Sequence, residues 1–296
     1  MPWDLLRRRH GLLLCGSGCH PLVAEGRHPS RREQQLDLKF MKPQWLRTHS
    51  FSRMPEETLG MDRSLAFIIE TETAVTFVGE GIQTIADWDA TEDRRIVGLH
   101  LLAQGFERLL KVTKALIQLS EEGTLPSSRE FRNLYGHILS GLLDDVLAAC
   151  RRDEDFTDRP AIRCDIEFLA CNELWRAMLD VLSELGSGGR YHDLDTMLDG
   201  DARSESPLDL WEIIEMDICK ADPKWLALME SDPASFSRQW YPHLAAIQTE
   251  TLQRAARAIT RMWTLGPAQE NGRTMTGTIS RYLFLTDRQL MTPTSS

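Results

Sequence analysis

The feature that most constrains the fold of this chain is a helical spacing of its apolar residues. Such residues recur at steps of three or four, which places them on one face of an α-helix and not on alternating faces of a strand. Gly123 and Pro126 are typical of a helix end, and Thr91 of a helix start. The clearest stretch contains Ile96, Leu99, Leu102, Ala103, Phe106, Leu109, Leu110, Val112, Leu116, Ile117 and Leu119.

The same spacing continues through most of the chain after Met61. We therefore predict an all-α bundle of about six to eight helices. β-branched residues in the first segment leave a strand as its alternative, and Met275–Leu290 is compatible with a helix or a β-hairpin. Residues 190–200 are expected to form an ordered loop with a short helical turn. Helices are expected over residues 61–87, 91–123, 127–152, 160–186, 207–220 and 234–265.

The chain divides by composition into three segments. Residues 1–53 mix arginine, histidine, proline and glycine and are expected to be a disordered extension, or sequence upstream of a true start at Met41, Met54 or Met61. Their apolar stretch is too short for a secretory signal, whereas an arginine-rich organelle presequence remains open. Residues 61–185 are expected to form the bundle, and residues 186–290 a C-terminal helical extension packed on it.

Charge is distributed unevenly along the chain, whose formal net charge is −10. Residues 1–60 hold ten basic and six acidic residues, which leaves 24 of the 34 basic and 38 of the 44 acidic residues for the remainder. Phosphate binding needs clustered cations. Any nucleic-acid contact is therefore expected to be local. The apolar runs are shorter than the roughly 20 residues of a membrane-spanning helix, so no membrane partner is expected.

The six cysteines follow no disulfide framework, which indicates a reduced, cytoplasmic protein. Cys15, Cys19 and His20 form a cluster, but no second pair of ligands accompanies it. Because a structural zinc site needs four ligands, we predict neither a metal site nor a cofactor.

The residues Arg132-Asn133-Leu134-Tyr135-Gly136-His137 form an R-x4-H motif. A ribonuclease without a metal needs a base to deprotonate the ribose 2′-hydroxyl and a cation to stabilise charge on the phosphate. Imidazole suits the first task and guanidinium the second. On one helix the two side chains would lie about 140° apart, so a twofold dimer is one way to bring two copies of the motif into one cleft. The alternative is that Arg132 is a solvated helix residue, while Tyr135 and His137 pack or form hydrogen bonds within the bundle.

This segment resembles the HEPN superfamily, small helical proteins that include many ribonuclease toxins and defence proteins. Glu107–Lys111 is similar to its E-x2-L-K pattern, and Gly136-His137 followed by Leu142-Leu143 to its G-H-x-L-x2-L-L segment. The resemblance covers residues 61–185 and implies a dimeric bundle of four or five helices. It implies that Arg132 and His137 are catalytic, with Asn133 as a polar assistant, and we add Tyr135 as a candidate substrate contact.

A second candidate contact for an anionic substrate is Arg190 with Tyr191, which follow Gly188 and Gly189. Flexible backbone amides beside a cation and an aromatic ring can bind an anion. The alternative is a helix C-cap followed by a packed tyrosine. The tryptophans are expected in the core because basic residues do not interleave with them: Trp175, Trp211, Trp225, Trp240 and Trp263.

Two functions follow from these observations. The first is a metal-independent endoribonuclease of the HEPN type, acting as a homodimer on RNA in a defence or toxin system. The second is a catalytically silent helical scaffold whose acidic helices bind a protein partner. The two differ in whether Arg132 and His137 from both copies converge in one exposed cleft.

Overall fold

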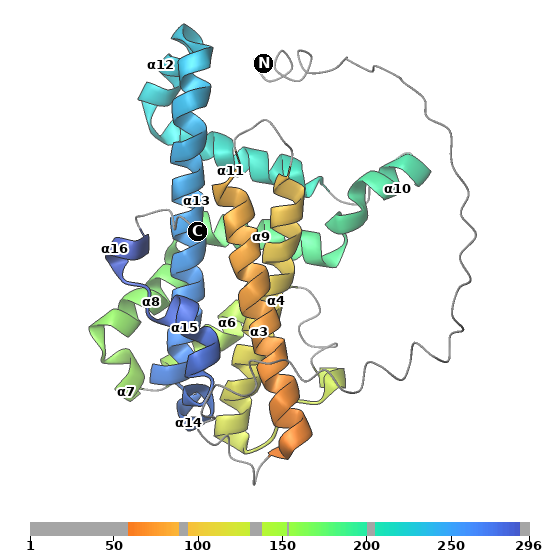
Figure 1. The fold of residues 1–296 in the computed structure, drawn as a ribbon, viewed down its shortest axis with the longest axis vertical. Coiled ribbons are helices and arrows are strands. Elements are labelled where there is room, and N and C mark those ends of the chain that lie inside the picture. The colour runs from red at the N-terminus through yellow and green to blue at the C-terminus, as the bar shows by residue number, and fades with distance from the viewer. Residues whose placement is uncertain (1–58, 89–93, 131–137, 153, 200–204, 291–296) are drawn as a thin grey trace, which may run out of the picture. The chain divides into compact units, whose positions relative to one another are not determined.

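The structure is a computed structural model that describes residues 59–88, 94–130, 138–152, 154–199 and 205–290. These residues all belong to one compact unit, residues 51–296. Within the described ranges every regular element is helical and no strand occurs, so the predicted all-α fold is confirmed (Figure 1). No helix in these ranges combines the length and the apolar character needed to cross a membrane.

Helices α3 (Met61–Ala86) and α4 (Arg95–Glu122) form a closely packed antiparallel pair (Figure 1). A Cβ atom added to Gly105 would lie 2.6 Å from the backbone nitrogen of Val78, and one added to Gly81 would lie 2.7 Å from Cγ of Leu102. Such distances are shorter than van der Waals contact, so glycine is what permits this approach. Helix α4 ends where predicted, because Gly123 adopts the left-handed conformation with φ of 69°.

The part of the chain that the structure describes contains thirteen α-helices, seven of them with 12 or more residues. The number exceeds the predicted six to eight because short helices fill the connections. Helix α12, for example, was not predicted. After α4 follow α6 (Leu139–Arg151), α7 (Glu154–Thr157), α8 (Pro160–Cys171), α9 (Glu173–Ser187), the 3-10 turn η3 (Gly189–Tyr191), α10 (His192–Asp199), α11 (Pro207–Ala221), α12 (Pro223–Ser231), α13 (Pro233–Leu265), α14 (Gln269–Arg273), α15 (Thr276–Leu283) and α16 (Asp287–Leu290).

Capping side chains set the starts of the later helices. The side chains of Ser206, Asp222 and Asp232 each accept a hydrogen bond from a backbone N–H in the first turn that follows. Proline occupies the next position in all three helices, where its missing N–H costs nothing. The pKa of the Asp222 carboxyl is lowered, mainly by hydrogen bonds from Lys224.

One predicted helix, residues 160–186, is in fact two. Asn172 has an extended backbone and its side chain accepts a hydrogen bond of 2.8 Å from the N–H of Trp175, so α8 ends there and α9 begins. An asparagine side chain competes with the helical backbone in this way. The resulting change of direction lets both helices pack against α13.

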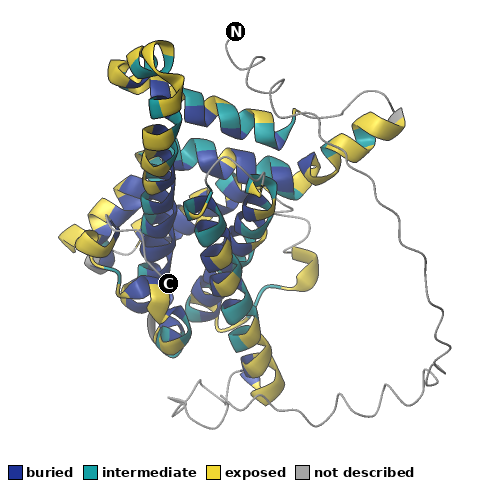
Figure 2. Ribbon diagram, turned by 45° about the horizontal axis from the view of Figure 1, so that its top comes forward, coloured by how far each residue is buried: buried dark blue, intermediate teal, exposed yellow. Residues whose placement is uncertain are grey.

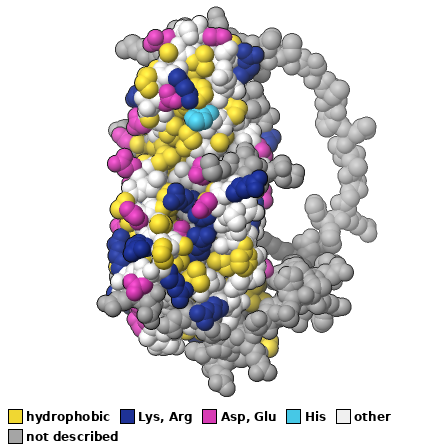
Figure 3. Space-filling view, turned by 90° about the vertical axis from the view of Figure 1, so that its left-hand side faces the viewer, with side chains coloured by type: hydrophobic (Ala, Val, Ile, Leu, Met, Phe, Trp, Pro, Cys, Tyr) yellow, Lys and Arg dark blue, Asp and Glu magenta, His cyan; other side chains and the backbone are white. Residues whose placement is uncertain are grey.

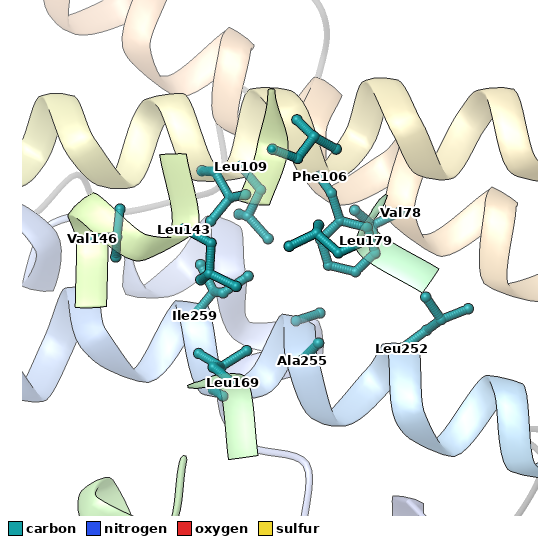
Figure 4. Packing of buried hydrophobic residues seen from close by; sticks show 14 of the residues in the cluster. Val78, Phe106, Leu109, Leu143, Val146, Leu169, Leu179, Leu252, Ala255 and Ile259 are labelled. Carbon is teal, nitrogen blue, oxygen red and sulfur yellow. The ribbon is translucent and has the colours of Figure 1, made fainter. Parts of the chain in front are cut away.

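A single hydrophobic core runs through the unit, and α13 packs against α3, α4, α8 and α9. Figure 4 shows Leu252, Ala255 and Ile259 of α13 facing Phe106 and Leu143. Figure 2 shows the buried side of α13 turned toward the neighbouring helices, while exposed residues dominate α10. Core residues come from both sides of the segment boundary expected after residue 185, and that boundary stays a prediction.

The five tryptophans are all buried, as predicted. Trp175, Trp211 and Trp263 belong to the main core. Trp225 and Trp240 belong to a second, smaller cluster between α11, α12 and the first half of α13, in which their ring centroids are 5.2 Å apart. Aromatic rings prefer such edge contacts to face-to-face stacking.

Candidate functional site

Four of the predicted site residues, Arg132, Asn133, Tyr135 and His137, lie outside the described residues. The residues before them form a capping box. The N–H of Glu130 donates to Oγ of Ser127 at 3.2 Å, and the N–H of Ser127 donates back to the Glu130 carboxylate. These hydrogen bonds lower the pKa of Glu130. A helix start at this point is therefore confirmed.

The helix predicted over residues 127–152 is not continuous. Ile138 has an extended backbone, with φ of −81° and ψ of 93°, and α6 begins only at Leu139. The N–H of Leu139 donates to Oγ of Ser183 in α9 at 2.9 Å. Gly136, two residues before the break, has low helix propensity. Arg132 and His137 precede this break and lie outside the described residues, so their expected separation of about 140° around one helix stays a prediction. Ile138 itself is 63% exposed.

The residues that carry the rest of the HEPN resemblance have identifiable structural roles. Glu107 and Lys111 form a salt bridge one turn apart on α4, and Leu110 between them is fully buried. Leu142 and Leu143 of α6 also lie in the core. Packing and an i,i+4 ion pair thus explain these positions without a substrate.

Arg190 and Tyr191 lie in η3, directly after α9. The guanidinium carbon of Arg190 is 5.3 Å from the centroid of the Tyr191 ring. Gly188 caps α9, which confirms the C-cap interpretation, but Tyr191 is 53% exposed and the packed tyrosine was a wrong prediction. The pKa of His100 is lowered, first by burial and then by the charge of Arg190. Arg190 therefore lies near α4.

An open groove of 640 Å³ lies between the first half of α3 and the second half of α4. Its lining includes the apolar Phe67 and Val112 and three charged residues, Arg63, Glu70 and Lys111. Ser127 and Ser128 also line it, and they precede Arg132 by five and four residues.

A local concentration of arginine was missed in the sequence. Residues 252–290 hold six arginines against two acidic residues, Glu270 and Asp287, within an acidic chain. Three of the arginines, Arg254, Arg257 and Arg261, are spaced for one face of α13. Figure 3 turns the left-hand side of Figure 1 to the viewer and shows Lys and Arg side chains gathered over its middle and lower part. The i, i+3, i+7 spacing was the available signal.

We define the arginine surface as six residues of α8, α13 and α16 and the turn before α8: Arg159, Arg163, Arg254, Arg257, Arg261 and Arg288. Contacts join these elements. Arg159 donates to the carbonyl of Leu265 at 3.5 Å, and Arg257 to the carbonyl of Leu285 at 3.2 Å. The guanidinium of Arg254 lies 4.4 Å from the Phe168 ring centroid.

Two carboxylates hold the inner arginines of this surface. Arg257 pairs with Asp287 at 2.7 Å, and Arg261 with Asp165 at 2.9 Å. Asp287 is largely exposed, yet its pKa is lowered by the hydrogen bond from Arg257 and by the charges of Arg257, Arg261 and Arg254. Arg159, Arg163 and Arg288 are exposed. Arg257 is buried, and Arg254 and Arg261 are half-buried. The guanidinium groups that can bind phosphates through paired N–H donors are therefore the three exposed ones.

Comparisons with known proteins found no relative of this chain. Among the described residues, no group of three or more His, Cys, Asp or Glu side chains could hold a metal ion. No family model matches the chain, and neither the search of curated proteins nor the search of solved structures found a similar protein.

Proposed function

We propose that this protein binds RNA and cleaves it without a metal ion. The observation that carries the proposal is the arginine surface, on which Arg159, Arg163 and Arg288 are exposed in an otherwise acidic chain. Sequence-independent RNA binding rests on cations that neutralise phosphates. A local surface of this kind is what an acidic protein needs in order to bind a polyanion.

The chemistry of the proposal belongs to the R-x4-H motif. His137 takes the proton of a ribose 2′-hydroxyl, whose oxygen attacks the adjacent phosphorus while the bond to the 5′-oxygen breaks. Arg132 stabilises the charge that develops on the phosphate, and Asn133 assists as a polar group. The leaving 5′-oxygen is protonated by solvent or by His137 of a second copy. The products are a 2′,3′-cyclic phosphate and a 5′-hydroxyl. We propose a homodimer as the active form.

The cleavage test uses purified full-length protein, total RNA and transfer RNA, with a chelator present. Wild type is expected to cleave, and His137→Ala and Arg132→Ala are expected to lose about 10²–10⁴-fold in rate. Exposed residues of the same types serve as matched controls, so His243→Ala and Arg238→Ala are expected to keep the wild-type rate. Absence of cleavage by the wild type, or cleavage abolished by the chelator alone, would contradict this activity.

RNA affinity tests the arginine surface separately. Replacing Arg159, Arg163 and Arg288 together with alanine is expected to weaken binding of a single-stranded RNA by about tenfold or more, and to lower the salt slope by about two. The measurement is fluorescence anisotropy at several salt concentrations. A control variant removes the same charge from exposed residues on α11–α13: Lys220, Lys224 and Arg238.

The RNA affinities of the two triple variants are compared with each other. Equal losses of RNA affinity in the two triple variants would mean that binding depends only on the total charge of the protein. Unchanged affinity after replacement of Arg159, Arg163 and Arg288 would remove the arginine surface from the proposal. Binding without cleavage would leave a catalytically silent RNA-binding protein.

A further inference from the structure

Helices α9 and α11 lie side by side (Figure 1). Their side chains line an open groove of 610 Å³. We call it the acidic groove. Its floor is apolar and its edges are carboxylates. Nine residues line it: Ala177, Asp180, Val181, Glu184, Glu205, Leu210, Ile213, Ile214 and Asp217.

The floor of the acidic groove leaves apolar surface in contact with water. Ile213 is 56% exposed, although Ile214 beside it is buried in the main core. Leu210 and Ala177 are half-buried. Covering an exposed isoleucine and its neighbours stabilises a complex by roughly 25 cal/mol for each Å² removed from water. The floor therefore favours a partner with an apolar side.

The edges of the groove determine the charge of that partner. All four ionisable residues in the lining are acidic, and neither Lys nor Arg is among them. Asp217 has an exposed pair with Lys220 at 3.4 Å. Within the described ranges, no salt bridge reaches Asp180, Glu184 or Glu205. Nucleic acids and anionic headgroups would be repelled by this rim, whereas lysine and arginine would be attracted.

We propose that the acidic groove binds a cationic amphipathic helix of a partner protein. The apolar stripe of that helix would lie on Ile213 and Leu210, and its Lys or Arg side chains would meet Asp180 and Glu184 on one edge and Asp217 on the other. The row of side chains along one face of a helix can pack into a groove between two other helices. Such recognition uses apolar side chains at positions i, i+3, i+4 and i+7 of the bound helix. This inference does not depend on the proposed ribonuclease activity.

The test uses full-length protein and a fluorescently labelled synthetic helix with leucine at i, i+3, i+4 and i+7 and lysine on both flanks. The same peptide with glutamate in place of lysine is the second probe. Wild type is expected to bind the lysine peptide and not the glutamate peptide. Reversing three exposed carboxylates, in Asp180→Lys/Glu205→Lys/Asp217→Lys, is expected to weaken binding at least tenfold.

A matched charge reversal separates the groove from the overall charge of the protein. Asp145, Glu167 and Glu230 are exposed on α6, α8 and α12, and their replacement by lysine gives the same change in net charge. This variant is expected to bind the lysine peptide within about twofold of wild type. Ile213→Ala tests the floor and is expected to weaken binding severalfold, because it removes an apolar anchor of the contact.

Three results would overturn the proposal. They are equal losses in the two charge-reversal variants, equal binding of both peptides, or no binding by the wild type. His137→Ala is expected to leave peptide binding unchanged, so the failure of either proposal can be recognised without the other.

Discussion

Replacing Trp263 with alanine is expected to lower the free energy of unfolding by about 3–5 kcal/mol. The side chain is fully buried in the main core. Its Nε1–H donates to Oγ1 of Thr113 at 2.7 Å, which joins α13 to α4. The alanine variant would lose the apolar contacts and also leave a cavity beside the Thr113 hydroxyl. Urea unfolding followed by circular dichroism measures the effect.

Two companion variants identify the origin of that loss. Thr113→Val removes the acceptor and leaves the indole N–H buried without a partner, at an expected cost of about 1–3 kcal/mol. Phe284→Ala is the matched aromatic control on the surface, since Phe284 is 65% exposed. It is expected to change the stability by less than about 0.5 kcal/mol. Similar losses in Trp263→Ala and Phe284→Ala would contradict the role of the core contact.

The second large effect is expected at Arg95, the start of α4. Its guanidinium pairs with Glu215 at 3.3 Å and Glu212 at 3.2 Å, and lies 4.5 Å from the Trp88 ring centroid. Glu215 is buried and also accepts a hydrogen bond from Gln248 at 3.3 Å. Arg95→Ala would leave that carboxylate buried without its cation, so the unfolding free energy is expected to fall by about 3–5 kcal/mol.

The pH dependence of the Arg95→Ala variant provides a sharper test. Burial raises the pKa of Glu215, and the charge of Arg95 opposes that rise. A raised folded pKa contributes stability that is present below the unfolded pKa and lost as the pH rises through the folded pKa. Without Arg95 the pKa rises further. The variant is therefore expected to lose more stability than wild type as the pH rises from the unfolded Glu pKa of about 4.3 through the raised folded pKa.

Glu215→Gln in the Arg95→Ala background is the control for this pH effect. A neutral amide of the same shape cannot titrate, so the added pH dependence is expected to disappear. A second control concerns the size of the Arg95→Ala effect. Lys220→Ala breaks an exposed ion pair with Asp217 and is expected to change the free energy of unfolding by less than about 1 kcal/mol. A pH slope that survives in the double variant would mean that another group causes it.

Local signals were sufficient to predict much of the helical structure. The spacing of apolar residues predicted α3, α4, α11 and α13, because one buried stripe of a helix repeats every three or four residues. Gly123 ended α4 as expected, since glycine takes a left-handed conformation without steric cost. The Ser127 and Glu130 capping box is equally local. The burial of five tryptophans was predicted because basic residues do not interleave with them along the chain.

What the sequence by itself determined is therefore the all-α class, most long helices and the composition of the core, because these depend on neighbours within about two helical turns. The tertiary structure alone decided the features that join distant residues. The hydroxyl of Ser183 binds the first N–H of α6, from 44 positions away, and the arginine surface joins α8 to α13 and α16. The acidic groove likewise exists only because α9 packs beside α11. Charge counted along a chain reports its total, whereas packing decides which charges meet on one surface.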